Sequence, residues 1–192
     1  MITHYRPRIL ARLESLIRPL AVPQVLDFGS GDGYFASQVG RLPQVERIAA
    51  VDVVERPDSL VTPRLYDGER LPFDDGAFDL AYAVDVLHHC PDPLRAIDDM
   101  ARCSRRYLLI KDHTYETALG RWTLAVLDEL GNRRFGIPSP YRYQKRWQWV
   151  EHIEAHGWRR VALEHPLDCH AGVLGAMTNP LQWIGLWERR PS

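Results

Sequence analysis

A glycine-rich segment near the N-terminus has the residue types and spacing for close contact with a ligand. The run Val25-Leu26-Asp27-Phe28-Gly29-Ser30-Gly31-Asp32-Gly33 is a short apolar stretch followed by three glycines at alternate positions. Glycine adopts positive φ readily and lets backbone N–H groups approach a ligand without interference from a Cβ atom. We therefore expect a strand that ends in a ligand-binding turn. Its candidate binding residues are Asp27, Gly29, Ser30, Gly31 and Gly33.

The spacing of these glycines discriminates between classes of cofactor. Dinucleotide-binding loops follow the pattern G-x-G-x-x-G, with a helix N-terminus facing the pyrophosphate. Here the pattern is G-x-G-x-G, and Asp27 precedes the first glycine by two residues, where a carboxylate suits a cationic ligand better than a diphosphate. Asp52 lies 23 residues beyond Gly29, at a position suited to accept hydrogen bonds from ribose hydroxyls. Together, the glycine segment and Asp52 favour a ribose-containing cofactor other than a nicotinamide dinucleotide.

Histidines that follow two later apolar runs are candidates for acid–base chemistry. His88 and His89 come after one run, and Asp112 and His113 end another. Open α/β sheets bind ligands at the carboxyl ends of their strands, and histidine titrates near neutrality. Asp112 and His113 are the first catalytic candidates, because the carboxylate could orient the imidazole as a general base, and His88 is the next. The alternative is structural: a packed loop for the histidine pair and a solvated strand end for Asp112 and His113.

The apolar runs that carry these motifs have the length of buried parallel strands. They span 25–28, 48–54, 60–66, 78–84 and 107–110, with helical patterns at 34–42 and 94–103. Repeated βαβ units of this kind indicate an α/β fold with a doubly wound sheet and helices on both faces. The second and third runs are too close together for a crossover helix, an inconsistency that one misplaced strand boundary would explain.

The remaining segments predict the surroundings of this core. We expect one domain over 1–192: an N-terminal amphipathic helix within 1–22, a cofactor-binding core over 24–112, a helical substrate cap over 113–150, and a C-terminal helix with an antiparallel edge hairpin over 151–192. The hairpin runs are 158–164 and 181–188, and the later helices are predicted at 116–130 and 143–156, separated by a loop rich in glycine and proline.

Cations and aromatic side chains alternate in the predicted cap, a composition suited to an anionic, partly apolar substrate. The candidate substrate contacts are Arg134, Tyr141 and Tyr143. The alternative is an amphipathic helix with its cations in water. The first cap helix has an apolar stripe that is more typical of a core face than of a binding face. This stripe comprises Leu119, Trp122, Val126, Leu127 and Leu130.

Composition limits the classes of protein to consider. The chain of 192 residues has a net charge of −1, so we expect no nucleic-acid partner. It has three cysteines and no apolar run of membrane-spanning length, from which we expect a cytoplasmic protein with no membrane span. Histidines and cysteines do not show paired metal-ligand spacing, and we expect no metal site.

Three blocks of sequence, in this order, resemble the class I S-adenosylmethionine-dependent methyltransferases, in the branch that includes quinone-biosynthesis enzymes. They are the glycine segment, the run Asp67-Gly68-Glu69-Arg70-Leu71-Pro72-Phe73, and Phe78-Asp79-Leu80 followed by Val86-Leu87-His88-His89. The resemblance covers about residues 24–112. It implies a Rossmann-like, mostly parallel sheet of seven strands with the last strand antiparallel, and S-adenosylmethionine as the cofactor.

The resemblance also assigns roles to individual side chains. It implies that Asp27 and the glycines lie beside the methionine part of the cofactor, Asp52 on the ribose, and Asp67 with Gly68 near the adenine. Asp85, which follows the fourth apolar run, is a further cofactor candidate.

The resulting hypothesis is methyl transfer to a small-molecule acceptor that is partly apolar or anionic. A sulfonium already carries a good leaving group, so alignment of the acceptor matters more than a large catalytic apparatus. The alternatives are a catalytically silent S-adenosylmethionine-binding accessory or regulatory module, and an enzyme that uses a nicotinamide cofactor, against which Asp27 and the glycine spacing count.

Overall fold

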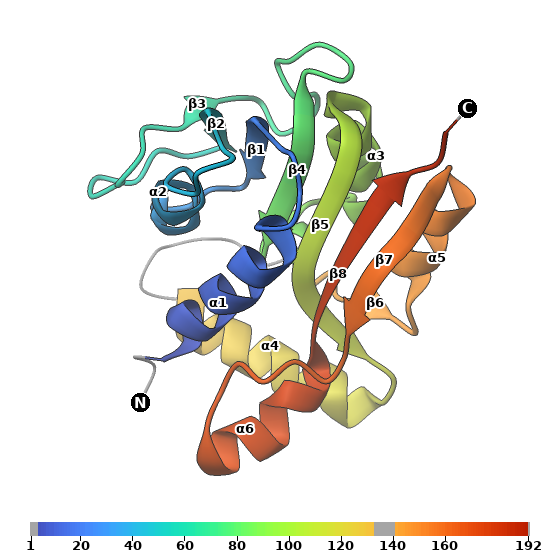
Figure 1. The fold of residues 1–192 in the computed structure, drawn as a ribbon. Coiled ribbons are helices and arrows are strands. Elements are labelled where there is room, and N and C mark those ends of the chain that lie inside the picture. Colours follow the sequence, from blue (N-terminus) through green and yellow to red (C-terminus); the bar gives the residue numbers. More distant parts are fainter. Residues whose placement is uncertain (1–3, 133–140, 192) are drawn as a thin grey trace.

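The computed structural model describes residues 4–132 and 141–191, which fold around one twisted sheet (Figure 1). Within these residues the strands are ordered β3-β2-β1-β4-β5-β8-β7, and β8 runs antiparallel to both of its neighbours. A short strand, β6, pairs with the end of β5. The strands are β1 (Gln24–Phe28), β2 (Arg47–Asp52), β3 (Arg64–Leu65), β4 (Phe78–Val84), β5 (Ser104–Tyr115), β6 (Gln144–Lys145), β7 (Trp158–Glu164) and β8 (Gln182–Arg189). The predicted fold class is confirmed.

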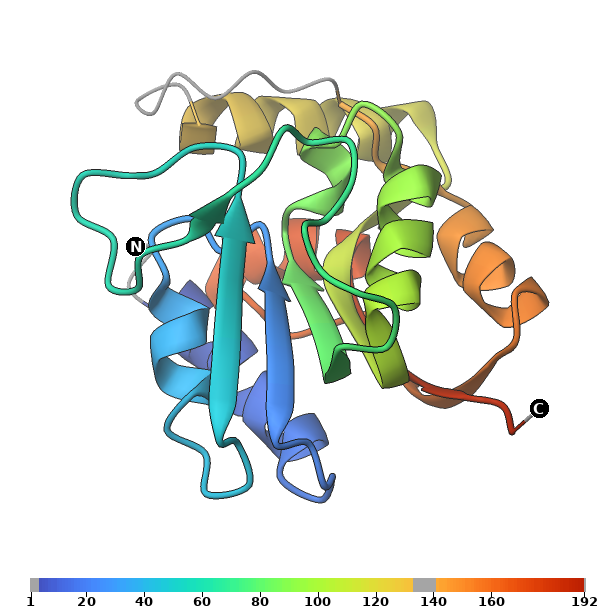
Figure 2. The same ribbon diagram turned by 90° about the horizontal axis from the view of Figure 1, so that it is seen from above.

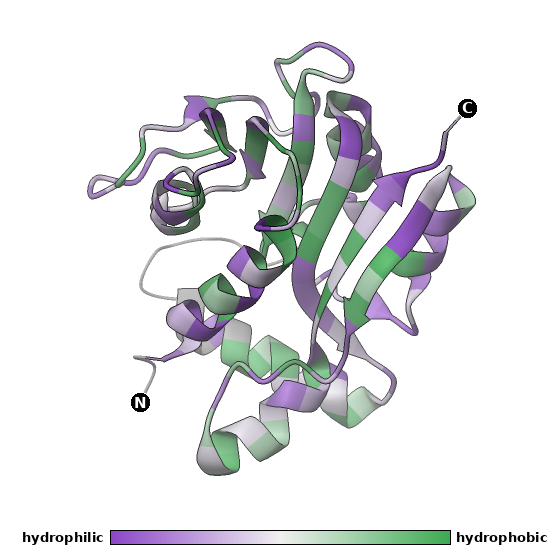
Figure 3. Cartoon of the chain, viewed as in Figure 1, coloured by the Kyte–Doolittle hydropathy of each residue, from purple (hydrophilic) through white to green (hydrophobic). Residues whose placement is uncertain are grey.

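Helices cover both faces of the sheet because the central strands are apolar on both sides. Alternate residues of β5 belong to different cores: Leu108 and Ile110 pack in the core that α3 and α5 cover, whereas Leu109 packs in the core that α1 and α2 cover. The α-helices are α1 (Tyr5–Ile17), α2 (Tyr34–Val39), α3 (Pro93–Cys103), α4 (Ala118–Asn132), α5 (Gln148–Ala155) and α6 (Gly172–Thr178). Figure 3 shows the hydrophobic middle of β4 and β5 and the hydrophilic end of β5.

The second crossover differs from a regular βαβ unit. β2 ends at Asp52, two residues earlier than predicted, and β3 has only two residues. The connection over 53–63 forms no helix in the structure. The strand boundaries of both predicted runs were therefore wrong. Pairing between these two strands is limited to Val51 with Arg64 and Asp52 with Leu65.

The fifth strand is longer than its apolar run indicated. β5 begins at Ser104 and continues to Tyr115, so Asp112 and His113 lie inside a strand instead of at its solvated end. The extension follows from its partners: β8 pairs with β5 as far as His113, and β6 pairs with Thr114 and Tyr115. Backbone pairing on these segments fixes the direction of the polar side chains at the end of the strand.

The cap region departs from its predicted pattern. The fifth helix begins at Gln148, and the side chain of Gln144 accepts hydrogen bonds from Trp149 N at 2.8 Å and Val150 N at 3.2 Å, which satisfies backbone donors at the helix start. The predicted buried stripe of α4 is wrong for its outer members. Leu119, Trp122 and Val126 are exposed, and the opposite side of the helix contributes the buried Leu124.

Figure 2 shows α4, in yellow, on the side of the sheet toward which the arrowheads of β1 and β2 point. Ligands of open α/β sheets bind at this carboxyl edge. Helix α4 therefore lies where a cover for the candidate site belongs. In the part of the chain that the structure describes, no helix is long and apolar enough to cross a membrane.

Candidate active site

The glycine segment forms a tight turn between β1 and α2. Gly29, Gly31 and Gly33 have φ of 70°, 60° and 73°, in the left-handed region that other residues adopt at a cost. The turn is held to the neighbouring strand, because Gly29 N and Ser30 N both donate to Val51 O, at 2.9 and 3.0 Å. A Cβ atom at Gly31 would lie 3.5 Å from the guanidinium carbon of Arg56, which covers this glycine.

Asp52 connects the end of β2 to the glycine turn. Its Oδ2 accepts a hydrogen bond from Gly31 N at 2.8 Å, and its Oδ1 accepts one from Val53 N at 2.7 Å. The two sequence motifs predicted to bind one cofactor therefore meet directly. Asp67 lies farther along the same edge and is exposed; hydrogen bonds to its Oδ1 from Glu69 N and Arg70 N hold the pKa of the carboxyl below its usual range.

Asp27 is buried on the side of β1 that faces α1 and α2. Burial raises the pKa of its carboxyl from 3.8 to about 7. Among the described residues, Oδ2 of Asp27 and Oγ of Ser30 have no well-formed hydrogen bond, and the hydroxyl of Tyr82 lies close enough to Asp27 to lower the pKa of the carboxyl against the effect of burial. Buried polar atoms are normally paired, so these atoms at the glycine turn are suited to a polar ligand.

The candidate catalytic residues come together at the end of β5. Oδ1 of Asp112 lies 2.6 Å from Nδ1 of His88 and 3.1 Å from Nδ1 of His113, and its Oδ2 accepts from Leu87 N at 3.1 Å. Burial alone would raise the pKa of Asp112, but the two imidazoles outweigh it and hold the pKa well below its usual range. One ionised carboxylate thus orients two histidines.

The ligand atoms of His88, Asp112 and His113 all lie within 4.8 Å of one another, a grouping that metal-ligand spacing in the sequence did not reveal. Two of these separations are hydrogen bonds between an imidazole and the carboxylate. The hydrogen bonds account for the grouping. The ring of His89 lies tilted against that of His88, with ring centroids 4.1 Å apart.

The histidine cluster is next to the glycine turn. A Cβ atom at Gly29 would come within 2.1 Å of the side chain of Val86, so the chain that follows β4 packs directly on the turn. His88 follows two residues later in a short 3-10 helix (Leu87–His89). Acid–base groups and the predicted cofactor loop therefore occupy the same edge of the sheet.

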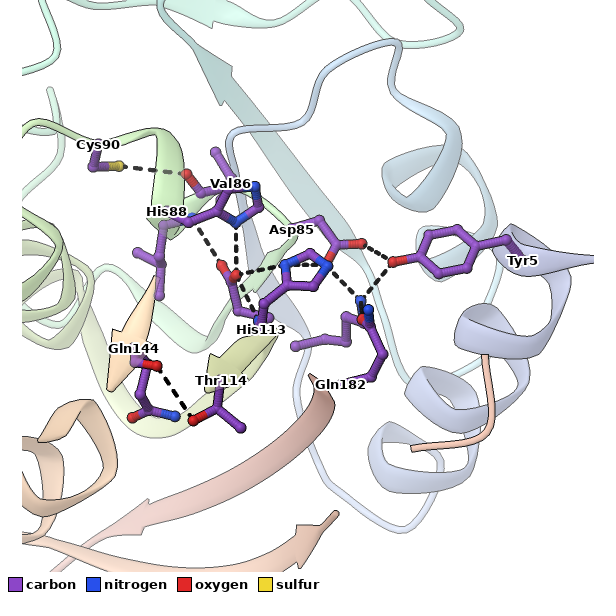
Figure 4. Close-up of polar contacts among 12 residues, drawn as sticks. Tyr5, Asp85, Val86, His88, Cys90, His113, Thr114, Gln144 and Gln182 are labelled. Atoms are coloured by element: carbon purple, nitrogen blue, oxygen red, sulfur yellow. Dashed lines mark hydrogen bonds and ion pairs between the residues drawn. The ribbon is translucent and has the colours of Figure 1, made fainter. Parts of the chain in front are cut away.

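The structure adds side chains to this site that sequence reasoning missed. Lys111 contacts Tyr5, Asp85 and Gln182 in a largely buried polar cluster, and Figure 4 labels these three partners. Asp85, predicted to bind the cofactor, here accepts hydrogen bonds from Tyr5 Oη at 2.7 Å and Lys111 Nζ at 2.5 Å. A lysine directly after the apolar run 107–110 was the available signal in the sequence.

Aromatic side chains from the predicted cap line the histidine cluster. The ring of Tyr143 is buried, with its centroid 5.3 Å from that of His88 and 6.1 Å from that of His113. Tyr141 lies outside it, and its hydroxyl donates to Glu129 on α4 at 2.9 Å. Of the three predicted substrate contacts, Tyr143 lies beside the cluster, Tyr141 lies next to Tyr143, and Arg134 lies outside the described residues.

A doubly wound sheet of this strand order, with a glycine turn after β1 and an acidic residue at the end of β2, defines a Rossmann-like cofactor-binding protein. The family described as a methyltransferase domain matches residues 2–170, and the chain belongs to this family. The resemblance to class I methyltransferases is confirmed at this level, whereas the quinone-biosynthesis branch is not specifically supported.

Individual relatives carry methyltransferase names. The chain is 27% identical over 111 residues to the 27-O-demethylrifamycin SV methyltransferase of Amycolatopsis mediterranei, covering 51% of this chain and 40% of the relative. It is 27% identical over 167 residues to the sarcosine/dimethylglycine N-methyltransferase of Halorhodospira halochloris, covering 76% of this chain and 58% of the relative. The chain thus spans about two fifths to three fifths of these relatives.

The same fold occurs in solved structures. An S-adenosylmethionine-dependent methyltransferase from Mesorhizobium loti superposes with a TM-score of 0.67 at 15% identity, over 93% of this chain and 96% of the other. Family membership and these neighbours support S-adenosylmethionine as the cofactor. The turn fits it through the unpaired buried oxygens of Asp27 and Ser30, which offer acceptors to a ligand.

Proposed function

We propose that this protein transfers the methyl group of S-adenosylmethionine to an oxygen or nitrogen of a small molecule, with a histidine as general base. The observation that carries the proposal is the carboxylate of Asp112 shared by His88 and His113 beside the glycine turn. Family membership supports a transferase over a silent binding module.

Each proposed cofactor-binding residue suits a different chemical group of S-adenosylmethionine. Asp27, with its unpaired Oδ2, suits the ammonium of the methionine part, and the guanidinium of Arg56 above Gly31 suits its carboxylate. Asp52 would accept from the ribose hydroxyls, and Asp67 with Gly68 would lie near the adenine. When bound, the cofactor supplies a methyl group on a positively charged sulfur.

The histidines are prepared to accept a proton. Nδ1 of His113 faces the carboxylates of Asp112 and Asp85, an arrangement that places the proton on Nδ1 and leaves Nε2 as the basic nitrogen. Burial lowers the pKa of His113 below 6.5, with Lys111 acting in the same direction. His113 is therefore neutral at physiological pH and can remove the proton of an attacking hydroxyl or amine.

The acceptor is proposed to be small and partly apolar or anionic. Tyr143 and Tyr141 form an aromatic wall at the histidines, and such a wall favours a planar or apolar group. Relatives are named for O-methylation of a rifamycin and for N-methylation of sarcosine, which supports a metabolite as the acceptor. Arg134 remains a proposed contact for an anionic group.

The proposal is tested by binding and by transfer. Calorimetry should detect binding of S-adenosylhomocysteine and no binding of NAD, and a labelled-methyl assay should detect transfer to hydroxyl or amino compounds in a metabolite panel. Asp112→Asn should lower transfer by about a hundredfold or more, the size of a general-base contribution, while S-adenosylhomocysteine affinity is retained. An unchanged rate of methyl transfer in Asp112→Asn would show that the histidine cluster takes no part in the mechanism.

A further inference from the structure

Lys111 is an unusual residue in this chain. Of its 24 lysines and arginines only two are lysines, and Lys111 is completely buried. It occupies β5 directly before Asp112, on the side of the strand that faces α1. A buried ammonium is costly unless its donors are paired, so its partners show what it does.

Each of the three ammonium donors has an acceptor on a different element. Nζ of Lys111 lies 2.6 Å from Oη of Tyr5 on α1, 2.5 Å from Oδ1 of Asp85 after β4, and 2.6 Å from Oε1 of Gln182 at the start of β8. A compact ammonium satisfies three converging acceptors, whereas a planar guanidinium with five donors would not fit them.

The acceptor that matters for chemistry is Asp85. Its φ of 53° turns the chain sharply at the end of β4, and its Oδ2 also accepts from Tyr5 Oη at 2.7 Å. The carboxylate of Asp85 also faces the active site, where its Oδ1 lies 3.7 Å from Nδ1 of His113. Figure 4 shows Asp85 between Tyr5 and His113. Lys111 thus binds a carboxylate that also faces the proposed base.

We propose that Lys111 is a positioning residue for the proposed methyl transfer: it fixes Asp85 between α1 and His113 and balances the negative charge that His113 faces. The inference rests on the proposed function for its catalytic meaning. The arrangement itself can be tested without an activity assay, because it predicts how the pKa of His113 changes when its neighbours are replaced.

The charged and titratable groups around His113 determine in which direction its pKa should change in each variant. Asp112 and Lys111 come from its own strand, Asp85 from the turn after β4, and His88 from the 3-10 helix. Three further groups near it or its partners carry no charge at neutral pH: Gln182 opposite it on β8, the ring of Tyr143, and Tyr5 beyond Asp85. His170, whose ring stacks on that of Tyr5 at 4.7 Å, is a further titratable group near Lys111 and Asp85.

Burial and Lys111 lower the pKa of His113, and Asp85 acts in the opposite direction. Replacing the ammonium by an isosteric neutral side chain should therefore raise the His113 pKa. Replacing Asp85 by a neutral side chain should lower it. Replacing both should leave it between the two single variants.

The test is an NMR titration of histidine ring signals in the full chain with Lys111→Met, Asp85→Asn and the double variant. Lys145→Met, which changes the other lysine, exposed on β6, is the matched control and should leave His113 unchanged. His156, exposed after α5, serves as the internal reference. A cooperative thermal melt reports that each variant is folded. The double variant covers the case in which Lys111→Met leaves Asp85 buried without a counter-charge and unfolds.

A higher His113 pKa in Lys111→Met than in the natural chain supports the proposal. If Lys111→Met unfolds, a higher His113 pKa in the double variant than in Asp85→Asn supports it instead. An unmoved His113 in folded variants overturns it, as does an equal shift in Lys145→Met. If methyl transfer is detected, each unit by which the pKa rises should lower kcat/KM below that pKa about tenfold. Shifted histidines without any methyl transfer would instead contradict the proposed function alone.

Discussion

The carboxyl of Asp27 is a buried acid whose ionisation should depend on the cofactor. In the free protein its pKa is about 7, above the ordinary 3.8, so the folded chain holds a proton between about pH 4 and 7 that the unfolded chain releases. This group therefore favours the folded state most at acidic pH, and its contribution declines as the pH rises through 7. An ammonium beside Oδ2 would reverse the preference by favouring the ionised form.

We therefore expect S-adenosylhomocysteine to bind more tightly at pH 8 than at pH 6, with a gain of up to about tenfold per pH unit below the pKa. Asp27→Asn should weaken binding at pH 8 and remove this pH dependence. Calorimetry across this pH range measures both effects. Asp98→Asn, which changes an exposed acid on α3, is the control and should keep the dependence. If affinity depends on pH in the same way in Asp27→Asn and the natural chain, the ammonium of the ligand does not bind at Asp27.

Gly31 tests whether the turn binds the cofactor or merely turns the chain. A left-handed residue other than glycine costs about 1–2 kcal/mol, so Gly31→Ala should lower Tm by a few degrees. Gly157→Ala is matched to it, because Gly157 has a φ of 88° and a Cβ there would meet nothing within 4 Å. Both variants should lose similar stability in thermal melts, and Gly31→Ala alone should lose S-adenosylhomocysteine affinity. Equal affinity in both would exclude close ligand contact at Gly31.

Sequence reasoning found single residues of the site better than their grouping. Asp27, Asp52 and the glycines were identifiable because each belongs to a local pattern. The contact between His88 and Asp112 was not, since it joins residues 24 apart through the pairing of β4 with β5. Lys111 was overlooked for a similar reason: its partners come from α1, β4 and β8, and only the folded chain brings them together.

At the scale of elements, apolar runs predicted the bounds of several strands well. β1 and β4, which are buried on both faces, and the edge strand β7 match their apolar runs to within one residue. β3 and the length of β5 were not predictable, because tertiary pairing decides them. The seven-residue α6 carries the exposed Val173 and Met177, and it was not predicted.

Helix α4 shows why an apolar stripe does not by itself identify the buried face. Its stripe of Leu119, Trp122 and Val126 is exposed, and Leu124 is 2% exposed. Leu124→Ala should cost about 2–5 kcal/mol, the range for a large-to-small change in a core, whereas Trp122→Ala should cost much less despite removing more atoms. Chemical denaturation of the two variants measures the difference. A larger cost for Trp122→Ala would restore the predicted orientation of the helix or place Trp122 in an interface between chains.

At the scale of the whole molecule, the strand order joins distant parts of the sequence into one site. The hairpin of β7 and β8 continues the parallel sheet next to β5, so C-terminal residues such as Gln182 reach the polar cluster of Lys111 and Asp85 beside the histidines. The resemblance to methyltransferases predicted the antiparallel last strand. It did not predict that the first helix would contribute Tyr5 to the same cluster, because the matching blocks start after that helix.

Helix α1 is positioned as an integral part of the domain. Ile9, Leu13 and Ile17 are buried in the core between α1 and the sheet, and two contacts lead from the start of the helix to the functional edge. Arg6 pairs with Asp32 in the glycine turn at 2.6 Å, and Tyr5 reaches Asp85. A helix anchored at its core face and at its start should unfold together with the sheet.

Leu13→Ala tests this cooperativity. The variant should lose about 2–5 kcal/mol in the single unfolding transition of the whole domain, because the deleted side chain is completely buried. Arg12→Ala, its neighbour on the exposed side, removes a half-exposed ion pair with Glu164 and should cost at most about 1 kcal/mol. Calorimetric melts with and without S-adenosylhomocysteine measure both, and the ligand should stabilise the two variants equally by mass action. If α1 were an appended segment, Leu13→Ala would leave the main transition in place and change only a separate, earlier one.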